Sequence, residues 1–202
     1  MKEDLTDKLL GLLKEGNISE FNKFREGRFT SRYQNFNDVD LSGAKLSGAS
    51  LSKASLSKAN LSKADLSGAN LSMANLSNAD LSEANLSQAN LGYSNLTHTD
   101  LSKAELSNAN LSKSNLSNAK LSGANLSSTI LSMTNLLHAD LSGANLSGAD
   151  LSYSNLTHAV ISKGNLAHAN LSRADLSNTD LSEAKIETAN LKEIKKEGTK
   201  EI

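Results

Sequence analysis

Residues 59–83 read ANLSK-ADLSG-ANLSM-ANLSN-ADLSE, a five-residue pattern repeated without interruption. From Leu41 to Leu191 every fifth residue is Leu or Ile, in 31 consecutive positions, and Phe36 adds one more centre. The residue two before each centre is Ala in 22 of the 31 copies, the residue before it is mostly Asn or Asp, and the residue after it is Ser in 24. Only the fifth position varies freely. The chain is an internal repeat, and the period of that repeat decides the fold.

A period of five fits neither regular secondary structure. On an α-helix, five steps of about 100° would leave successive leucines about 140° apart, so no apolar stripe would form. On a long strand, an odd spacing would place successive leucines on opposite faces. A short extended piece of about three residues followed by a corner puts the small residue and the Leu on the same side. The chain must therefore coil around a column of Leu side chains.

Side chains of one kind recur every 20 residues, and this sets the number of repeats in a coil. His98, His138 and His158 share one such register. Another register holds large exposed residues: Tyr33, Met73, Tyr93, Met133 and Tyr153. Four repeats per coil give a square cross-section in which side chains of one kind stack on one another in adjacent coils. The 32 centres then make about eight coils. Gly at the variable position suits a corner with positive φ. Because other corners carry Tyr, Met or Lys there, we expect those corners to use a different turn.

The motif, as in Ala59-Asn60-Leu61-Ser62-Lys63, resembles the pentapeptide repeat family. The resemblance covers roughly residues 34–191. It implies an all-β fold, a right-handed quadrilateral β-helix, and the family supplies the handedness and the turn geometry. The five-residue frame and the twenty-residue columns come from this sequence.

The two ends break the repeat. In residues 1–33, leucines at helical spacing predict a helix over about residues 3–14, and residues 17–25 predict a second short helix. We interpret this segment as a helical cap over the open edge of the first coil, in preference to a docking site for a partner. Residues 192–202 form a charged C-terminal segment, for which we expect a short helix or a frayed tail.

Composition excludes several classes of protein. The 202 residues include no Cys, so disulfides, thiolate metal sites and a cysteine nucleophile are excluded. With 21 Lys and Arg against 22 Asp and Glu, the chain lacks the basic excess that direct nucleic-acid binding needs. The first residues are acidic where a secretory signal would be basic, and no long apolar run follows. We therefore expect a cytoplasmic protein with no membrane contact.

No chemical site stands out from the repeat. Ser is frequent because the repeat requires it, and a convex rod with a filled interior offers no pocket for a catalytic triad. We expect no enzymatic activity and no cofactor. His138 and His158 should lie on adjacent coils, with Asp140 nearby, and could share a metal ion. No supporting ligand is evident, so we interpret them as surface histidines and expect no metal.

The most informative surface is the side that carries the large residues. The stretch from Tyr93 to His98 recurs from Tyr153 to His158, with Met133 to His138 between them. We expect this side to contact an unidentified protein partner through Met73, Tyr93, Met133, Tyr153, His98, His138 and His158. The competing interpretation is that these columns reflect stacking along the rod or repeat duplication, without a partner. Two copies could also associate weakly through an end of the rod.

The function predicted is a non-catalytic interaction scaffold. The alternative comes from the family resemblance, because some members protect type II topoisomerases such as gyrase by presenting a DNA-like acidic rod. The repeat region here holds 13 acidic and 10 basic residues, and Lys120 interrupts the main acidic column. A mimic of DNA needs a dense negative field, so we place this alternative second.

Overall fold

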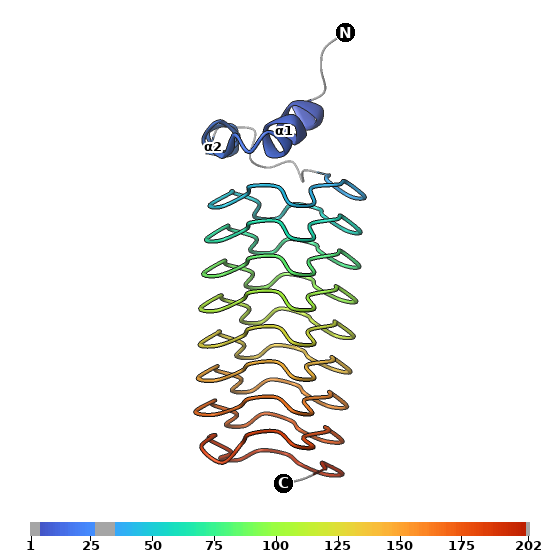
Figure 1. Cartoon of the computed structure of the whole chain (residues 1–202), viewed down its shortest axis with the longest axis vertical. Coiled ribbons are helices and arrows are strands. Elements are labelled where there is room, and N and C mark those ends of the chain that lie inside the picture. Colours follow the sequence, from blue (N-terminus) through green and yellow to red (C-terminus); the bar gives the residue numbers. More distant parts are fainter. Residues whose placement is uncertain (1–4, 27–34, 201–202) are drawn as a thin grey trace.

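The computed structural model describes residues 5–26 and 35–200. Two short helices, α1 (Leu5–Lys14) and α2 (Ile18–Glu26), lie across one end of a rod of stacked coils (Figure 1). The cap residues 1–4 and 27–33, with residue 34, lie outside the described part of the chain, and so do residues 201–202 of the C-terminal segment. Both predicted helices are therefore present, within two residues of their expected bounds.

The rod is a β-helix in which each coil takes 20 residues. Isolated parallel bridges join residues 20 apart at every fifth position, from Asn35↔Ser55 to Asp180↔Lys200. The backbone N–H of Leu101 donates to the Lys120 carbonyl at 2.7 Å, and the N–H of Asp100 donates to Ala79 at 3.0 Å. Each short strand is thus hydrogen-bonded to the coil above and to the coil below. This confirms four five-residue repeats per coil, and residues 35–194 make eight coils.

The interior is a dry column of aliphatic side chains. Between Leu46 and Leu176 every central Leu or Ile is fully buried, and from Ala49 onward the Ala residues two positions earlier are buried beside them. Where Ser or Thr replaces an inward Ala, its hydroxyl bonds to a carbonyl. For example, Ser94 Oγ donates to Leu91 O at 2.6 Å, and Thr134 Oγ1 donates to Leu111 O at 2.9 Å. The inward-pointing leucines predicted from the sequence are confirmed, and the polar exceptions are satisfied.

All described corners except the one at Thr188 use the same left-handed backbone conformation, which contradicts the expectation of two turn types for Gly and non-Gly corners. Gly68 has φ of 62°, and Lys63, Tyr93 and Met133 have φ of 59°, 60° and 58°. A left-handed conformation costs a non-glycine residue roughly 1–2 kcal/mol. The ladder offsets this cost, because the N–H of Tyr93 donates to Ser112 O at 3.0 Å on the next coil. At these left-handed corners the variable side chain is therefore held outward, whatever its identity.

The Asn or Asp before each Leu closes the next turn. Its side-chain oxygen accepts the backbone N–H two residues ahead, as in Ser62 N to Asn60 Oδ1 at 3.1 Å and Ser182 N to Asp180 Oδ1 at 3.1 Å. Such turns explain why only Asn and Asp dominate this position. The side-chain and backbone hydrogen bonds from Ser182 lower the pKa of the Asp180 carboxyl below its ordinary value.

Helix α2 replaces the missing coil at the N-terminal edge. Among the described residues, no strand precedes the first coil at Ser50. Instead, the Ser50 N–H donates to Asn22 Oδ1 at 2.8 Å, and Arg25 Nε donates to the Ser50 carbonyl at 2.7 Å. Arg25 also donates to Ser52 O, and burial lowers the pKa of its guanidinium. Below the helices, the rings of Phe21 and Phe36 lie 6.5 Å apart between their centres.

The C-terminal segment differs from its prediction. Residues 192–200 continue the coil instead of forming a helix or a tail, and Lys195 and Lys200 bridge to Asp175 and Asp180. The sequence does not indicate this additional coil, because Lys196 occupies the central position that Leu occupies in the other repeats. Ile194, at the preceding inward position, is only partly buried. The ladder of backbone hydrogen bonds from the coil above is sufficient to template the chain.

Candidate interaction face

One corner of the rod carries most of its large exposed apolar and aromatic side chains. This Tyr/Met corner carries residues 53, 73, 93, 113, 133, 153, 173 and 193 at the variable position. Met73, Tyr93, Met133 and Tyr153 are 54%, 56%, 54% and 50% exposed. Because each sits at a left-handed corner, each projects away from the ladder. The structure thus brings the four predicted residues into one row; Tyr33, assigned to the same row, lies outside the described residues.

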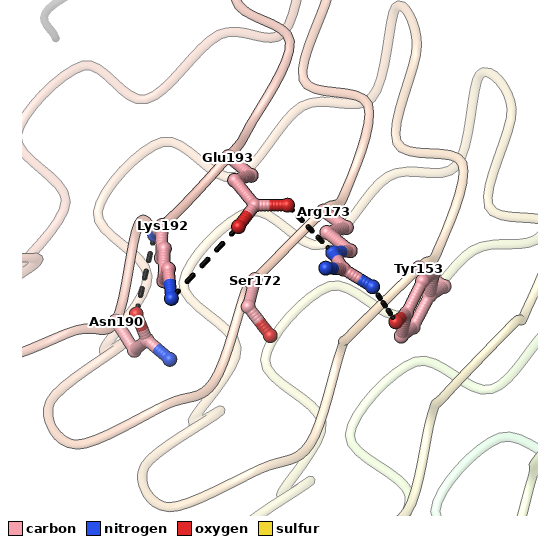
Figure 2. Close-up of a pocket in the computed structure, with 6 residues that line it drawn as sticks. All are labelled: Tyr153, Ser172, Arg173, Asn190, Lys192 and Glu193. Carbon is pink, nitrogen blue, oxygen red and sulfur yellow. Dashed lines mark hydrogen bonds and ion pairs between the residues drawn. The ribbon is translucent and has the colours of Figure 1, made fainter.

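Each described Tyr on this corner is contacted by a cationic side chain from the next coil. Lys113 Nζ donates to Tyr93 Oη at 2.9 Å and lies 5.1 Å from the centre of the ring. Arg173 donates to Tyr153 Oη in the same way, with its guanidinium 5.3 Å from the ring centre (Figure 2). These pairs are exposed, so they contribute little stability, but they fix how the tyrosines are presented.

Arg173 also links the Tyr/Met corner to the last coils. Its Nε lies 2.7 Å from Glu193 Oε2, and this hydrogen bond raises the pKa of the guanidinium. The side chains surround an open cavity of about 210 Å³, lined by Tyr153, Ser172, Arg173, Asn190, Lys192 and Glu193 (Figure 2). Glu193 also lies 3.8 Å from Lys192 Nζ, so both cations that line this cavity already form ion pairs with Glu193.

The histidines form a second row on the neighbouring corner. This His corner carries residues 58, 78, 98, 118, 138, 158 and 178. The rings of His138 and His158 stack with centres 4.9 Å apart and planes 12° from parallel, whereas Asn118 separates them from His98. Parallel stacked rings do not aim their nitrogen lone pairs at a shared ion. Within residues 5–26 and 35–200, no cluster of three or more potential metal-ligating side chains is present.

Between the two corners lies a strip that has no charged residue from residue 75 to residue 155, here called the Asn face; Asp175 follows on the next coil. Its outward residues are Asn75, Asn95, Asn115, Asn135 and Asn155. Asn95 Nδ2 donates to Asn75 Oδ1 at 3.1 Å, and Asn135 and Asn155 continue a similar ladder at 3.1 and 3.2 Å. The structure therefore places both predicted rows along the edges of one face.

Three apolar residues of the surface were not identified from the sequence. Leu137 occupies a position that is Ser in most repeats, and it lies at the edge of the Asn face, partly exposed. Ile130 and Val160 occupy the Asn/Asp position on other faces and are 44% and 37% exposed. The signal was available, because each breaks a nearly invariant position of the repeat.

The coil geometry agrees with comparisons to known proteins. A family model described as pentapeptide repeats matches residues 35–72, 79–118, 89–127, 119–157 and 154–192, with 8 copies. The chain belongs to the pentapeptide repeat family. No curated protein sequence gives a significant match.

Two solved pentapeptide repeat structures share this right-handed β-helix. HetL, which is involved in heterocyst differentiation regulation in the cyanobacterium Nostoc sp. strain PCC 7120, is 33% identical. That match covers 82% of this chain and 84% of HetL, with a TM-score of 0.60. A trypsin-treated variant of QnrB1, a plasmid-mediated fluoroquinolone resistance protein, is 24% identical over 75% of this chain and 76% of its own, with a TM-score of 0.64. The QnrB1 likeness concerns the fold alone.

Neither α1 nor α2, the helices in the described part of this pentapeptide repeat protein, has the length and apolar character that crossing a membrane requires.

Proposed function

We propose that this pentapeptide repeat protein is a non-catalytic cytoplasmic scaffold that binds a protein partner through the Asn face and its two flanking corners. The observation that carries the proposal is the gathering of half-exposed Met73, Tyr93, Met133 and Tyr153 on one corner. Tyr and Met are enriched at protein interfaces, and charged residues are depleted from interface cores. The interior supports a binding role over a catalytic one, because leucine side chains fill it.

The histidines would complete the contact from the other edge. His98, His138 and His158 are exposed along the Asn face, opposite the aromatic row. An imidazole can donate and accept hydrogen bonds, so these side chains would add specificity to the apolar contacts. The tyrosines would supply rigid contact area.

The charge pattern favours a scaffold over a DNA mimic. On the main acidic column, Asp80 and Asp100 each accept a hydrogen bond from their own turn, and Lys120 Nζ lies 3.6 Å from Asp100 Oδ2. On the adjacent corner, Lys63 lies 3.9 Å from Glu83. Positive charges thus interrupt the acidic residues along the rod, and the field of a phosphate backbone is not reproduced.

Replacing Tyr93 and Tyr153 together by Ala tests the scaffold proposal. Both side chains are half exposed, so the melting temperature should change by less than about 3 °C, while truncating interface aromatics should weaken binding at least about tenfold. The measurement is affinity capture from a native lysate, followed by titration of the captured protein. The matched control replaces Lys103 and Lys163 by Ala on the opposite side of the rod. Equal capture by the Tyr variant and the control would reject the proposed face.

A further inference from the structure

Charge is segregated around the rod. Ten Lys, Arg, Asp and Glu residues occur between positions 59 and 149, and Lys113 is the one on the Tyr/Met corner, the Asn face or the His corner. The other nine lie on two adjacent faces and the corner between them, on the opposite half: Lys63, Asp65, Asp80, Glu83, Asp100, Lys103, Glu105, Lys120 and Asp140. Over these coils, the side with the Asn face therefore carries less charge to desolvate than the rest of the rod. Toward the C-terminal end, Arg173 and Glu193 add an ion pair to the Tyr/Met corner, and Asp175 adds a charge to the Asn face.

Three of the five amides of the Asn face, those of Asn95, Asn135 and Asn155, already donate to the Asn of the preceding coil. The Oδ1 atom of Asn135 accepts the Leu137 N–H at 3.2 Å and the Asn155 amide at 3.2 Å, while its own amide donates to Asn115 at 3.1 Å. Because these hydrogen bonds are internal to the rod, a partner could cover the amides without breaking them. The desolvation cost that usually opposes burial of polar side chains is therefore small.

The apolar character of this surface peaks on a single coil. Met133 stands at one edge of the Asn face, and Leu137, which replaces the usual Ser, stands at the other edge, four residues later. Coils on either side carry Tyr or Lys at the first position and Ser or Thr at the second. The centre of the surface along the rod axis is therefore the coil of residues 133–138.

The Tyr/Met corner repeats every three coils, and its order is self-complementary. From residue 73 onward it reads Met, Tyr, Lys, Met, Tyr, Arg at steps of 20 residues. If a second copy is laid antiparallel with Met133 on Met133, Lys113 meets Tyr153 and Tyr93 meets Arg173. Both are Tyr–cation pairs of the kind that each chain already forms within itself, between Tyr93 and Lys113 and between Tyr153 and Arg173. Moving the two-fold axis one coil, to Lys113, would instead set Lys113 against Lys113 and Lys53 against Arg173.

The same register pairs polar residues on the His corner. His98 meets Asn178 and Asn118 meets His158, so imidazoles face amides, with His138 next to its own copy at the axis. A second copy is also a partner whose spacing, about 4.8 Å per coil, matches this surface over its whole length. A helix, with about 5.4 Å per turn, would drift out of register by almost 2 Å after three coils.

We propose that the Asn face and its flanking corners form an antiparallel, two-fold symmetric dimer interface between two copies of the chain, centred on Met133. This rests on the proposed function, in that the same surface is the binding surface, and it names the partner. Seven overlapping coils give a footprint about 34 Å long and about 16 Å wide. That size lies toward the lower end of specific interfaces, so a dimer with micromolar dissociation is expected.

Cross-linking of single-cysteine variants tests the dimer and its register, because the chain contains no native Cys. Under mild oxidation, Met133→Cys should form a disulfide-linked dimer at least about tenfold faster than Lys103→Cys, which lies on the opposite half. Met73→Cys should stay near the control rate, since Met73 faces Glu193 of the second copy. A Met133→Cys rate no faster than the control overturns the dimer. A Met73→Cys rate that equals or exceeds the Met133→Cys rate overturns the register.

Sedimentation equilibrium of the unmodified full-length chain separates this inference from the proposed function. The wild type should dimerise, and the variant with Tyr93 and Tyr153 replaced by Ala should dissociate at least about tenfold more readily. Thermal melts would verify that the variants are folded. A wild type that is monomeric at its highest attainable concentration overturns the dimer, whereas the capture experiment could still find another protein on the same face.

Discussion

Replacing Leu101 by Asp is expected to destroy the cooperative unfolding of the β-helix. Leu101 is completely buried in the middle of the column, between leucines of the coils above and below. The change removes buried apolar area and places a carboxylate where it has no partner, which costs at least about 5 kcal/mol. That is comparable to the total stability of an ordinary domain. Because each coil packs only on its neighbours, damage at the centre divides the rod.

Far-UV circular dichroism on heating measures this effect. The control is Lys103→Asp, two residues along the same coil, where the side chain is exposed and the carboxylate stays in water. The control should melt within a few degrees of the wild type. A Leu101→Asp protein that melts cooperatively near the wild-type temperature would show that the central residues do not face inward.

Removing the polar side chains with which α2 covers the first coil should have the next largest effect. Replacing Asn22 and Arg25 together by Ala eliminates the bonds from these side chains to the backbone of Gly48, Ser50 and Ser52. Hydrogen bonds that involve a charged group contribute about 1.5–3 kcal/mol each, so the double variant should lose roughly 3 kcal/mol of stability. The exposed strand edge should also pair with other molecules.

Thermal melting and static light scattering report these two consequences separately. Lys23→Ala is the matched control, because Lys23 lies on the same helix and makes only an exposed ion pair with Glu20 at 3.6 Å. The control should keep the wild-type melting temperature and mass. If the double variant does the same, the helices are not a cap for the β-helix.

Much of the fold follows from the sequence because one interaction dominates it. The Leu at every fifth position can be buried only by coiling, and the rows of Tyr, Met and His fix four repeats per coil. The corners could not be predicted in the same way. A residue such as Tyr93 disfavours positive φ in isolation, and only the inter-coil hydrogen bond to Ser112 O makes it acceptable.

The ends of the chain depend on context more than on residue type. Lys195 and Lys200 carry no repeat signature, yet they pair with the coil above because its free edge offers donors and acceptors. Likewise, the spacing of Asn22 and Arg25 does not predict that their side chains form hydrogen bonds with the backbone N–H and carbonyl of Ser50. The candidate face was predictable as two rows of residues, whereas the uncharged strip between them, with Leu137 at its edge, required the arrangement of the four faces.

We propose that this protein acts through the surface between its Tyr/Met and His corners. Methyl NMR of the protein labelled at methionine tests this directly. The chain has only three Met residues, and two of them, Met73 and Met133, lie on the Tyr/Met corner. On titration with the captured partner, or on raising the protein concentration, the Met133 methyl resonance should shift or broaden. A Met133 resonance that stays unchanged while binding is saturated would contradict the account.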